Sequence, residues 1–278
     1  MNTLAVVLER AKHLNEKKED LNRDFEVLLC HCLNKPRSWL YSHSKCFVTD
    51  LQAEKFLDLA VKRIRGIPVA YLIGRKEFWS LELEVDDNTL IPRPETELLI
   101  EWALELNLPK NSKVLDLGTG SGAIALALAS ERSDLQILAV DFCEKALSVA
   151  QNNAIRLGLD RVSFLKSDWY ASLPKIRYWD LIISNPPYVD INSSIANDLH
   201  FEPAIALFSS DSGLAALRRI IFASKDYLKP SGYLILEHGF DQALDVAETL
   251  EIAGYFEIQT KLDLAGLERA TGGKRNAD

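Results

Sequence analysis

The sequence is poor in cysteine, in long apolar runs and in positive charge. The four cysteines are Cys30, Cys32, Cys46 and Cys143. They follow no regular pairing pattern, so we expect reduced thiols rather than a disulfide framework. The longest apolar run, residues 123–129, is far below the ~20 residues that span a bilayer. Glu9 and Arg10 interrupt the first apolar stretch too early for a secretory signal, so we expect a cytoplasmic protein without a membrane anchor.

Acidic residues outnumber basic ones. Asp plus Glu total 40 and Lys plus Arg total 32, which leaves a formal charge of −8. Because phosphate neutralisation supplies much of the affinity for nucleic acid, we expect no direct binding of DNA or RNA. Apolar residues make up 47% of the chain, and 278 residues suffice to bury a core without disulfides. At roughly 150 residues per domain, this length predicts about two globular domains.

The first quarter of the chain has helical periodicity. Apolar residues recur at helical spacing within 4–14, 25–32 and 56–64, and a short helical turn begins near Pro36. The candidate N-caps are Asp20 or Asn22 for the second helix and Thr49 or Asp50 for the last. Residues 1–74 are therefore predicted to form a small helical domain. A β-hairpin or extended connector follows over 75–94, with Asp86, Asp87 and Asn88 as turn residues.

From residue 95 onward, short apolar strands alternate with helices. The expected strands are 113–117, 136–140, 162–166, 179–183, 232–236 and 255–260. The expected helices are 95–107, 122–131, 144–157, 212–228 and 240–253. This alternation predicts an α/β domain over 95–278 with a doubly wound, mostly parallel sheet. The long non-periodic segment 184–211 is predicted to be functional or mobile, and the tail 272–278 to be frayed.

A glycine-rich turn follows the first strand of this domain. Residues 116–122 read Asp-Leu-Gly-Thr-Gly-Ser-Gly at a strand-to-helix turn, where doubly wound folds bind nucleotides. Asp141 ends the next strand, about 20 residues later, where a carboxylate can accept both ribose hydroxyls. The pattern indicates a ligand that contains adenosine. A dinucleotide, with Ala123 in place of the third glycine, and tight packing without a ligand remain alternatives.

A second motif, Asn185-Pro186-Pro187-Tyr188, follows the predicted strand 179–183. The Asn185 carboxamide oxygen and the Pro186 carbonyl are two acceptors that could hold both N–H groups of a planar nitrogen. The prolines stiffen the loop, and Tyr188 offers a flat apolar face. Such a nitrogen is a weak nucleophile, so a reaction at it depends on its precise placement. A stiff turn with a capping asparagine is the alternative.

Together the two motifs resemble class I methyltransferases, which use S-adenosylmethionine and methylate planar nitrogens of adenine, cytosine or glutamine. Further segments resemble the release factor glutamine methyltransferases, the PrmC or HemK family. The matching segments are 74–79, 90–97, 167–169, 201–203, 211–213, 236–239 and 253–255. A sister family that methylates a ribosomal-protein glutamine typically reads Pro-Arg-Ser-Pro at the segment matching 91–97. Here that segment reads Ile-Pro-Arg-Pro-Glu-Thr-Glu, which favours release factors as partners.

The resemblance implies the reaction and the residues that perform it. The reaction is methyl transfer to N5 of the glutamine in a Gly-Gly-Gln loop, with S-adenosylhomocysteine as product. The implied cofactor-binding residues are Gly118, Thr119, Gly120, Ser121 and Gly122 at methionine, Asp141 at ribose, Asp168 and Trp169 at adenine, and Asn185. The implied substrate-binding residues are Asn185, Pro186, Pro187 and Tyr188, of which Asn185, Pro186 and Tyr188 are catalytic. We expect a monomer whose helical domain docks the release factor.

Several other polar residues have weaker interpretations. Glu237 and His238 end a strand at the ligand edge, but methyl transfer to an amide needs no base, so we favour a structural role. Glu202 in the long segment is open to either interpretation. The sequence Cys30-His31-Cys32 contains metal-ligand types, yet alternate helical residues point apart, so we expect no metal. A nucleic-acid methyltransferase and a non-catalytic binding module are the alternative functions.

Overall fold

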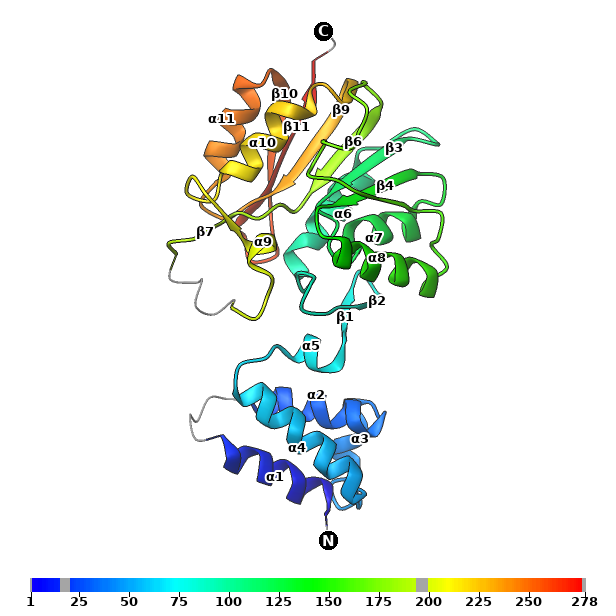
Figure 1. Cartoon of the computed structure of the whole chain (residues 1–278), viewed down its shortest axis with the longest axis vertical. Coiled ribbons are helices and arrows are strands. Elements are labelled where there is room, and N and C mark those ends of the chain that lie inside the picture. Colours follow the sequence, from blue (N-terminus) through cyan, green and yellow to red (C-terminus); the bar gives the residue numbers. More distant parts are fainter. Residues whose placement is uncertain (1, 16–20, 194–199, 277–278) are drawn as a thin grey trace. The chain divides into compact units, whose positions relative to one another are not determined.

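The computed structural model describes residues 2–15, 21–193 and 200–276 (Figure 1). The chain divides into two compact units, Met1–Arg75 and Lys76–Asp278. Each unit has a buried apolar core of its own. The division falls where the helical sequence pattern ends and the predicted connector begins.

The N-terminal unit is helical. Its helices are α1 (Leu4–Leu14), α2 (Asn22–Leu33), α3 (Arg37–Ser42), α4 (Asp50–Ile64) and α5 (Val69–Ile73). Their apolar faces meet around Phe25 and Phe56, which are 1% and 0% exposed. Thr49 caps α4 in a capping box with Gln52, as one of the two expected caps. Asn22 is not a cap, because it is already the first residue of α2, and Asp20 lies outside the described residues.

The connector forms a hairpin that, apart from Arg75, is part of the second unit. Strands β1 (Arg75–Phe78) and β2 (Leu81–Glu84) pair across the two residues Trp79 and Ser80. Asp86, Asp87 and Asn88 form a turn as expected, but this turn follows β2 and does not join the two strands. Trp79 and Ser80 both have positive φ, 50° and 58°, as two-residue hairpin turns require. Neither Trp nor Ser is typical of turn positions with positive φ, so the sequence pattern did not predict this turn.

The second unit is built on a seven-stranded sheet, which confirms the predicted fold class. The strand order is β10-β11-β9-β6-β3-β4-β5. The bounds are β3 (Lys113–Leu117), β4 (Gln136–Asp141), β5 (Ser163–Lys166), β6 (Trp179–Ser184), β9 (Leu228–Glu237), β10 (Tyr255–Leu262) and β11 (Glu268–Arg275). The five strands from β9 to β5 are parallel, and β11 is antiparallel to both of its neighbours. The chain returns from β5 to place β6 beside β3, which creates the topological switch point where such sheets bind ligands.

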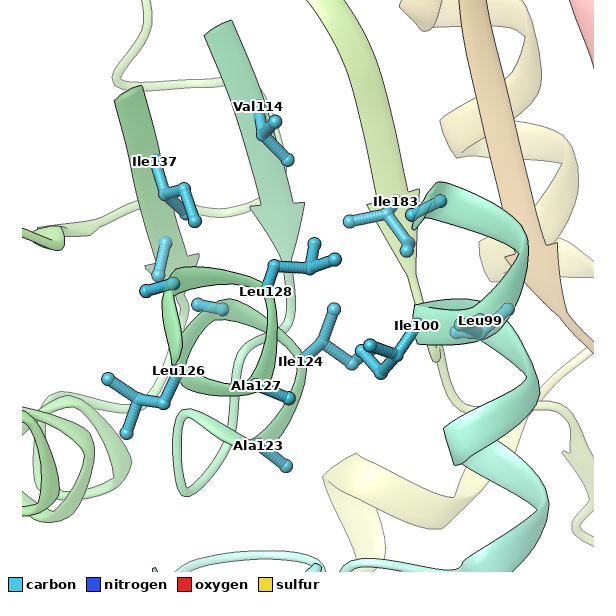
Figure 2. Close-up of a cluster of buried hydrophobic side chains, with 14 of the residues drawn as sticks. Leu99, Ile100, Val114, Ala123, Ile124, Leu126, Ala127, Leu128, Ile137 and Ile183 are labelled. Carbon is cyan, nitrogen blue, oxygen red and sulfur yellow. The ribbon is translucent and has the colours of Figure 1, made fainter. Parts of the chain in front are cut away.

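Helices cover both faces of the sheet. They are α6 (Glu97–Glu105), after the 3-10 turn η1 (Pro94–Thr96), α7 (Ala123–Glu131), α8 (Glu144–Arg156), α10 (Ala215–Ser224) and α11 (Ala243–Ile252). On one face, α6 and α7 pack Ile100 and Ile124 near Val114 and Ile183 (Figure 2). On the other, α10 and α11 pack against the alternate residues of the same strands. Because both faces are buried, the central strands read as continuous apolar runs.

Two segments differ from the sequence expectation. The tail is not frayed over 272–275, because β11 lies between β9 and β10. A Cβ on Gly272 would lie 2.5 Å from the Leu234 carbonyl oxygen, so glycine permits that close approach. Within 184–211, α9 (Ala204–Leu207) and the paired short strands β7 (Val189–Asp190) and β8 (Phe208–Ser209) form. Residues 277–278 lie outside the described residues.

Candidate active site

A cavity of about 510 Å³ lies at the carboxyl ends of β3, β4, β5 and β6. Sequence-predicted residues that line it are Gly118, Gly120, Asp141, Asp168, Trp169, Asn185 and Pro187. The structure therefore brings together residues that follow four different strands. Another hollow, of about 710 Å³, lies near Lys113 and Gln136 at the opposite strand ends and contains none of the predicted residues. Chemistry, rather than size, identifies the site.

Some residues of the glycine-rich turn line the cavity, and the others pack beneath it. Gly118 and Gly120 line the cavity at φ of 73° and 56°. Gly122 serves the core, because a Cβ there would lie 2.9 Å from Leu126 Cδ1. Thr119 and Ser121 are 5% and 2% exposed and do not line the cavity. The buried Ser121 hydroxyl oxygen has no hydrogen-bond partner within the described chain.

Asp116 lies directly below this turn, and the sequence analysis did not single it out. It is fully buried, and its Oδ2 accepts a hydrogen bond from Thr119 Oγ1 at 2.6 Å. Burial raises the pKa of Asp116 to about 7, and the Thr119 hydroxyl opposes that rise. A buried carboxyl with a raised pKa under a ligand loop is a signal that only the fold reveals.

Asp141 ends β4 with its carboxylate held by two backbone groups. Its Oδ2 accepts from the Gly120 nitrogen at 2.9 Å and its Oδ1 from the Cys143 nitrogen at 2.8 Å. Burial raises its pKa, and these N–H groups lower it. Each oxygen keeps a lone pair, so the group is oriented to accept two neighbouring hydroxyls.

A flat apolar region lies next to Asp141, with the ion pair of Asp168 and Arg219 at its edge. Phe142 and Trp169 line it, and Phe142 is 57% exposed. Trp169 has φ of 50°, and its ring lies 3.5 Å from the position of a Cβ on Gly118. Asp168 Oδ2 accepts from Arg219 Nη2 of α10 at 2.8 Å. Phe142 and Arg219 are lining residues that the motif search missed, since their signal is only proximity in the fold.

Asn185 directly follows β6 and faces the cavity. Its Nδ2 donates to Thr96 Oγ1 at 3.0 Å, which leaves its carbonyl oxygen free to accept. Pro187 lines the cavity and Pro186 is buried. Tyr188 does not line it, because its hydroxyl turns away to donate to Glu237 Oε1 at 3.0 Å. The structure thus places Asn185 and Pro187 at the cavity, and Tyr188 in the loop's support.

Glu237 and His238 are buried at the end of β9. Burial raises the pKa of Glu237 to about 7, whereas the hydroxyls of Thr96 and Tyr188 lower it. His238 Nδ1 lies 2.8 Å from the Gly239 carbonyl oxygen, so Nδ1 donates and Nε2 accepts from Thr271 Oγ1 at 2.7 Å. Burial lowers the pKa of His238, which keeps the ring neutral. His238 joins β9 to β11 and does not line the cavity.

Glu202 holds the long segment against the residues before η1. Its Oε2 accepts from the Ile91 nitrogen at 3.1 Å, and its Oε1 pairs with Arg93. The Glu202 side chain is 5% exposed, so the carboxylate of this ion pair is shielded from water, whereas the Arg93 side chain is 33% exposed. Neighbouring residues Asn88 and Leu90 line the cavity, and the connector therefore supplies part of its wall.

Comparison with known proteins assigns the family. A family described as the PrmC N-terminal domain matches residues 7–74, and one described as a methyltransferase domain matches residues 108–253. The release factor glutamine methyltransferase of Shewanella oneidensis is 46% identical over 94% of this chain and 92% of that protein. The chain belongs to the release factor glutamine methyltransferase family. The Escherichia coli protein of that name is 42% identical over 93% of this chain and 94% of its own length.

Solved structures show the same methyltransferase fold at lower identity. A Pyrococcus furiosus methyltransferase is 16% identical with a TM-score of 0.55, covering 79% of this chain and 98% of that chain. The Thermus thermophilus 16S rRNA N2 G1207 methyltransferase, solved with AdoMet and guanosine, is 20% identical with a TM-score of 0.53. It covers 73% of this chain and 50% of that one. These likenesses support the fold of this glutamine methyltransferase family member.

Membrane-spanning helices and clusters of metal ligands are both absent from the described part of the chain. None of its helices is both long and apolar enough to cross a bilayer. Within the same residues, no group of three His, Cys, Asp or Glu side chains is placed to hold a metal, including the segment 30–32. All four cysteines are free thiols.

Proposed function

We propose that this methyltransferase binds S-adenosylmethionine in the 510 Å³ cavity and methylates N5 of the Gly-Gly-Gln glutamine of peptide chain release factors. The observation that carries the proposal is the orientation of Asn185. Its Nδ2 is engaged by Thr96, so its Oδ1 is free to accept from an amide nitrogen at the cavity. The names of the relatives point to the same substrate.

The cavity residues fit this cofactor. S-adenosylmethionine supplies a methyl group on a positively charged sulfur. The Asp141 carboxylate, already oriented by two backbone N–H groups, would accept both ribose hydroxyls. Phe142 and Trp169 would hold the adenine between apolar surfaces, with Asp168 beside it. Gly118 and Gly120 would let the methionine part approach the backbone closely.

Asn185 and Pro186 would position the glutamine. The side-chain amide of glutamine carries two N–H groups, which Asn185 Oδ1 and the Pro186 carbonyl would accept. These bonds hold the nitrogen toward the methyl group and strengthen as positive charge develops on it. Because Tyr188 is turned toward Glu237, its role in this scheme is to support the loop. No residue has to remove a proton before attack.

The helical unit would dock the protein substrate. It contains no cavity-lining residue, yet it exposes Tyr41, Phe47 and Leu51, which are 65%, 68% and 76% exposed. A glutamine at the tip of a loop offers the cavity little area, so binding energy must come from a remote surface. A monomer with two functional units is sufficient for this scheme.

Methyl transfer from labelled cofactor to purified substrates tests the proposal. Release factor, ribosomal protein and nucleic acid are offered separately, and a release factor with its Gly-Gly-Gln glutamine replaced is the matched control. We expect label only in the unaltered release factor, with the added methyl on that glutamine by mass spectrometry. Equal labelling of the altered factor would contradict the assigned residue. Labelling of ribosomal protein or nucleic acid instead would show that the substrate is not a release factor.

A further inference from the structure

The Gln242 side chain binds the backbone of three separate loops. Its Nε2 donates to the carbonyl oxygens of Tyr188 and Ser212, both at 3.0 Å. Its Oε1 accepts from the Gly239 nitrogen at 2.8 Å. Gln242 occupies the N-cap position of α11 and is 8% exposed, so these hydrogen bonds are shielded from water. One buried amide therefore joins the loops that follow β6, β8 and β9.

The partners of this amide determine its direction. All three are backbone groups, in which a carbonyl oxygen only accepts and a peptide N–H only donates. A reversed Gln242 amide would place its oxygen against two carbonyl oxygens and its donors against the Gly239 N–H. The observed orientation satisfies all three groups, and none of them titrates, so the contact does not depend on a protonation state.

The two carbonyl groups belong to two different segments of the cavity wall. Tyr188 directly follows Pro187, which lines the cavity. Ser212 lies between residues 208–210 and residues 215–216, all of which line it. Beyond Tyr188 the two segments also pair, because β7 and β8 form a short parallel ladder. Gln242 therefore links the loop proposed to hold glutamine to the cavity segment 208–216.

Gly213 allows these two segments to approach each other so closely. Its φ is 86°, and a Cβ there would lie 2.0 Å from the Tyr188 carbonyl oxygen and 2.6 Å from Gln242 Nε2. These two atoms form the hydrogen bond itself, so any larger residue at position 213 would force them apart. The close approach and the buried amide thus belong to the same contact.

We propose that Gln242 is a positioning residue for methyl transfer, which sets the loop 185–188 against the segment 208–216. This inference rests on the glutamine methylation proposed above. Gln242 does not line the cavity, and it acts through the Tyr188 carbonyl, three residues after Asn185. Its loss would therefore misplace the substrate amide. Cofactor affinity is maintained, because the contacts that orient Asp141 do not involve Gln242.

Gln242→Met tests this role without burying a charge. Methionine keeps the length of the side chain but removes both donors and the acceptor. We expect kcat on release factor to fall about tenfold or more, because a displacement of about 1 Å at a reacting atom can cost 100-fold. The dissociation constant of S-adenosylmethionine, measured by calorimetry, should change less than about threefold. The matched control is Gln259→Met at an exposed position of β10, which should behave as wild type.

Gly213→Ala tests the same contact from its other side. The added methyl group would displace the Tyr188 carbonyl from Gln242, so kcat should fall as in Gln242→Met. The double variant should lose little more than either single variant, because both remove one interaction. Losses that multiply in the double variant would show that the two residues act independently and would overturn the inference.

The division of the effect between kcat and cofactor affinity separates positioning from a general structural role. A folded Gln242→Met with wild-type kcat would overturn the inference. An equal loss of cofactor affinity and of kcat would overturn it too, because Gln242 would then support the whole cavity. Wild-type enzyme that transfers no methyl to release factor would instead overturn the proposed function, and the inference with it.

Discussion

At the scale of single residues, the site depends on a few polar groups whose orientation is set by neighbours. Backbone N–H groups orient the Asp141 carboxylate, and Thr96 engages the Asn185 amide nitrogen. Burial raises the pKa of the nearby Asp116 carboxyl group to about 7. Each of these arrangements predicts a measurable effect of replacing one side chain.

Asp141→Ala is expected to weaken S-adenosylmethionine binding. The substitution removes the carboxylate proposed to accept both ribose hydroxyls, and hydrogen bonds to a charged group contribute about 1.5–3 kcal/mol each. The dissociation constant should therefore rise at least tenfold, as measured by isothermal titration calorimetry. An unchanged dissociation constant would mean that Asp141 only organises the Gly120 and Cys143 backbone.

Asn185→Ala is expected to abolish most methyl transfer while leaving the fold intact. The lost acceptor matters most as charge develops on the substrate nitrogen, so kcat should fall by about 100-fold or more. Single-turnover kinetics with release factor measures this. Asn192→Ala, the same change at an exposed position further along the loop, is the control and should behave as wild type. A near-normal kcat in Asn185→Ala would contradict the placement mechanism.

Asp116 is expected to make stability depend on pH. Its folded-state pKa of about 7 exceeds the ordinary value of 3.8, so the folded chain holds this proton more tightly than the unfolded chain. The stability that this proton contributes is complete below about pH 4 and is lost as pH rises through about 7. Urea unfolding at several pH values should show a smaller decline for Asp116→Asn than for wild type. Parallel declines in the two proteins would contradict the assignment.

At the scale of elements, the cavity depends on contacts between segments far apart in the chain. The residues before η1 meet the long segment after β6 through Glu202, which binds the Ile91 nitrogen and Arg93. The hairpin β1–β2 packs on α8, where Asn153 Oδ1 accepts from the Glu84 nitrogen at 2.7 Å. These contacts hold the connector residues that form one wall.

Glu202→Ala is expected to destabilise this wall. The change leaves the Ile91 nitrogen and Arg93 without their acceptor, so the free energy of unfolding should fall by about 1–3 kcal/mol. Denaturant unfolding measures the loss, and KM for release factor should rise in parallel. Glu101→Ala, at an exposed position of α6, is the control and should change stability by less than about 0.5 kcal/mol. Equal effects of the two substitutions would show that the Glu202 contacts contribute nothing specific.

At the scale of the whole molecule, chemistry and proposed docking belong to different units. Each unit has its own apolar core, and every cavity-lining residue lies in the second unit. The second unit therefore contains everything that the proposed cofactor site needs. The first unit affects activity only through the protein substrate in this proposal.

The fragment 76–278 is expected to bind cofactor but to methylate full-length release factor poorly. Its activity on a short Gly-Gly-Gln peptide should stay close to that of the whole chain, because a peptide cannot use the docking surface. Rates on the two substrates measure the difference. In the full chain, Phe47→Ser with Leu51→Ser should reproduce the selective loss without truncation. Equal losses on peptide and protein would show that the helical unit shapes the active site instead.

The sequence by itself determined the features that depend on local periodicity and short motifs. Alternating apolar strands and helices predict the α/β fold, since period and turn residues specify elements locally. The glycine turn, Asp141 and Asn185 could be found because each ends or directly follows a parallel strand, and these strand ends meet at one edge of the sheet. The two-residue turn at Trp79 was missed because neither residue favours positive φ.

Only the tertiary structure decided which side chains face the cavity and which support it. Tyr188 turns to Glu237, and Thr96 contacts Asn185 from 89 residues away in sequence. Gly122 lies so close to Leu126 that a Cβ would not fit there. The raised pKa of Asp116 likewise arises from burial. Such contacts join segments that no local pattern relates, and burial depends on all the layers that cover a residue. They exist only once the sheet has formed and both of its faces have been covered.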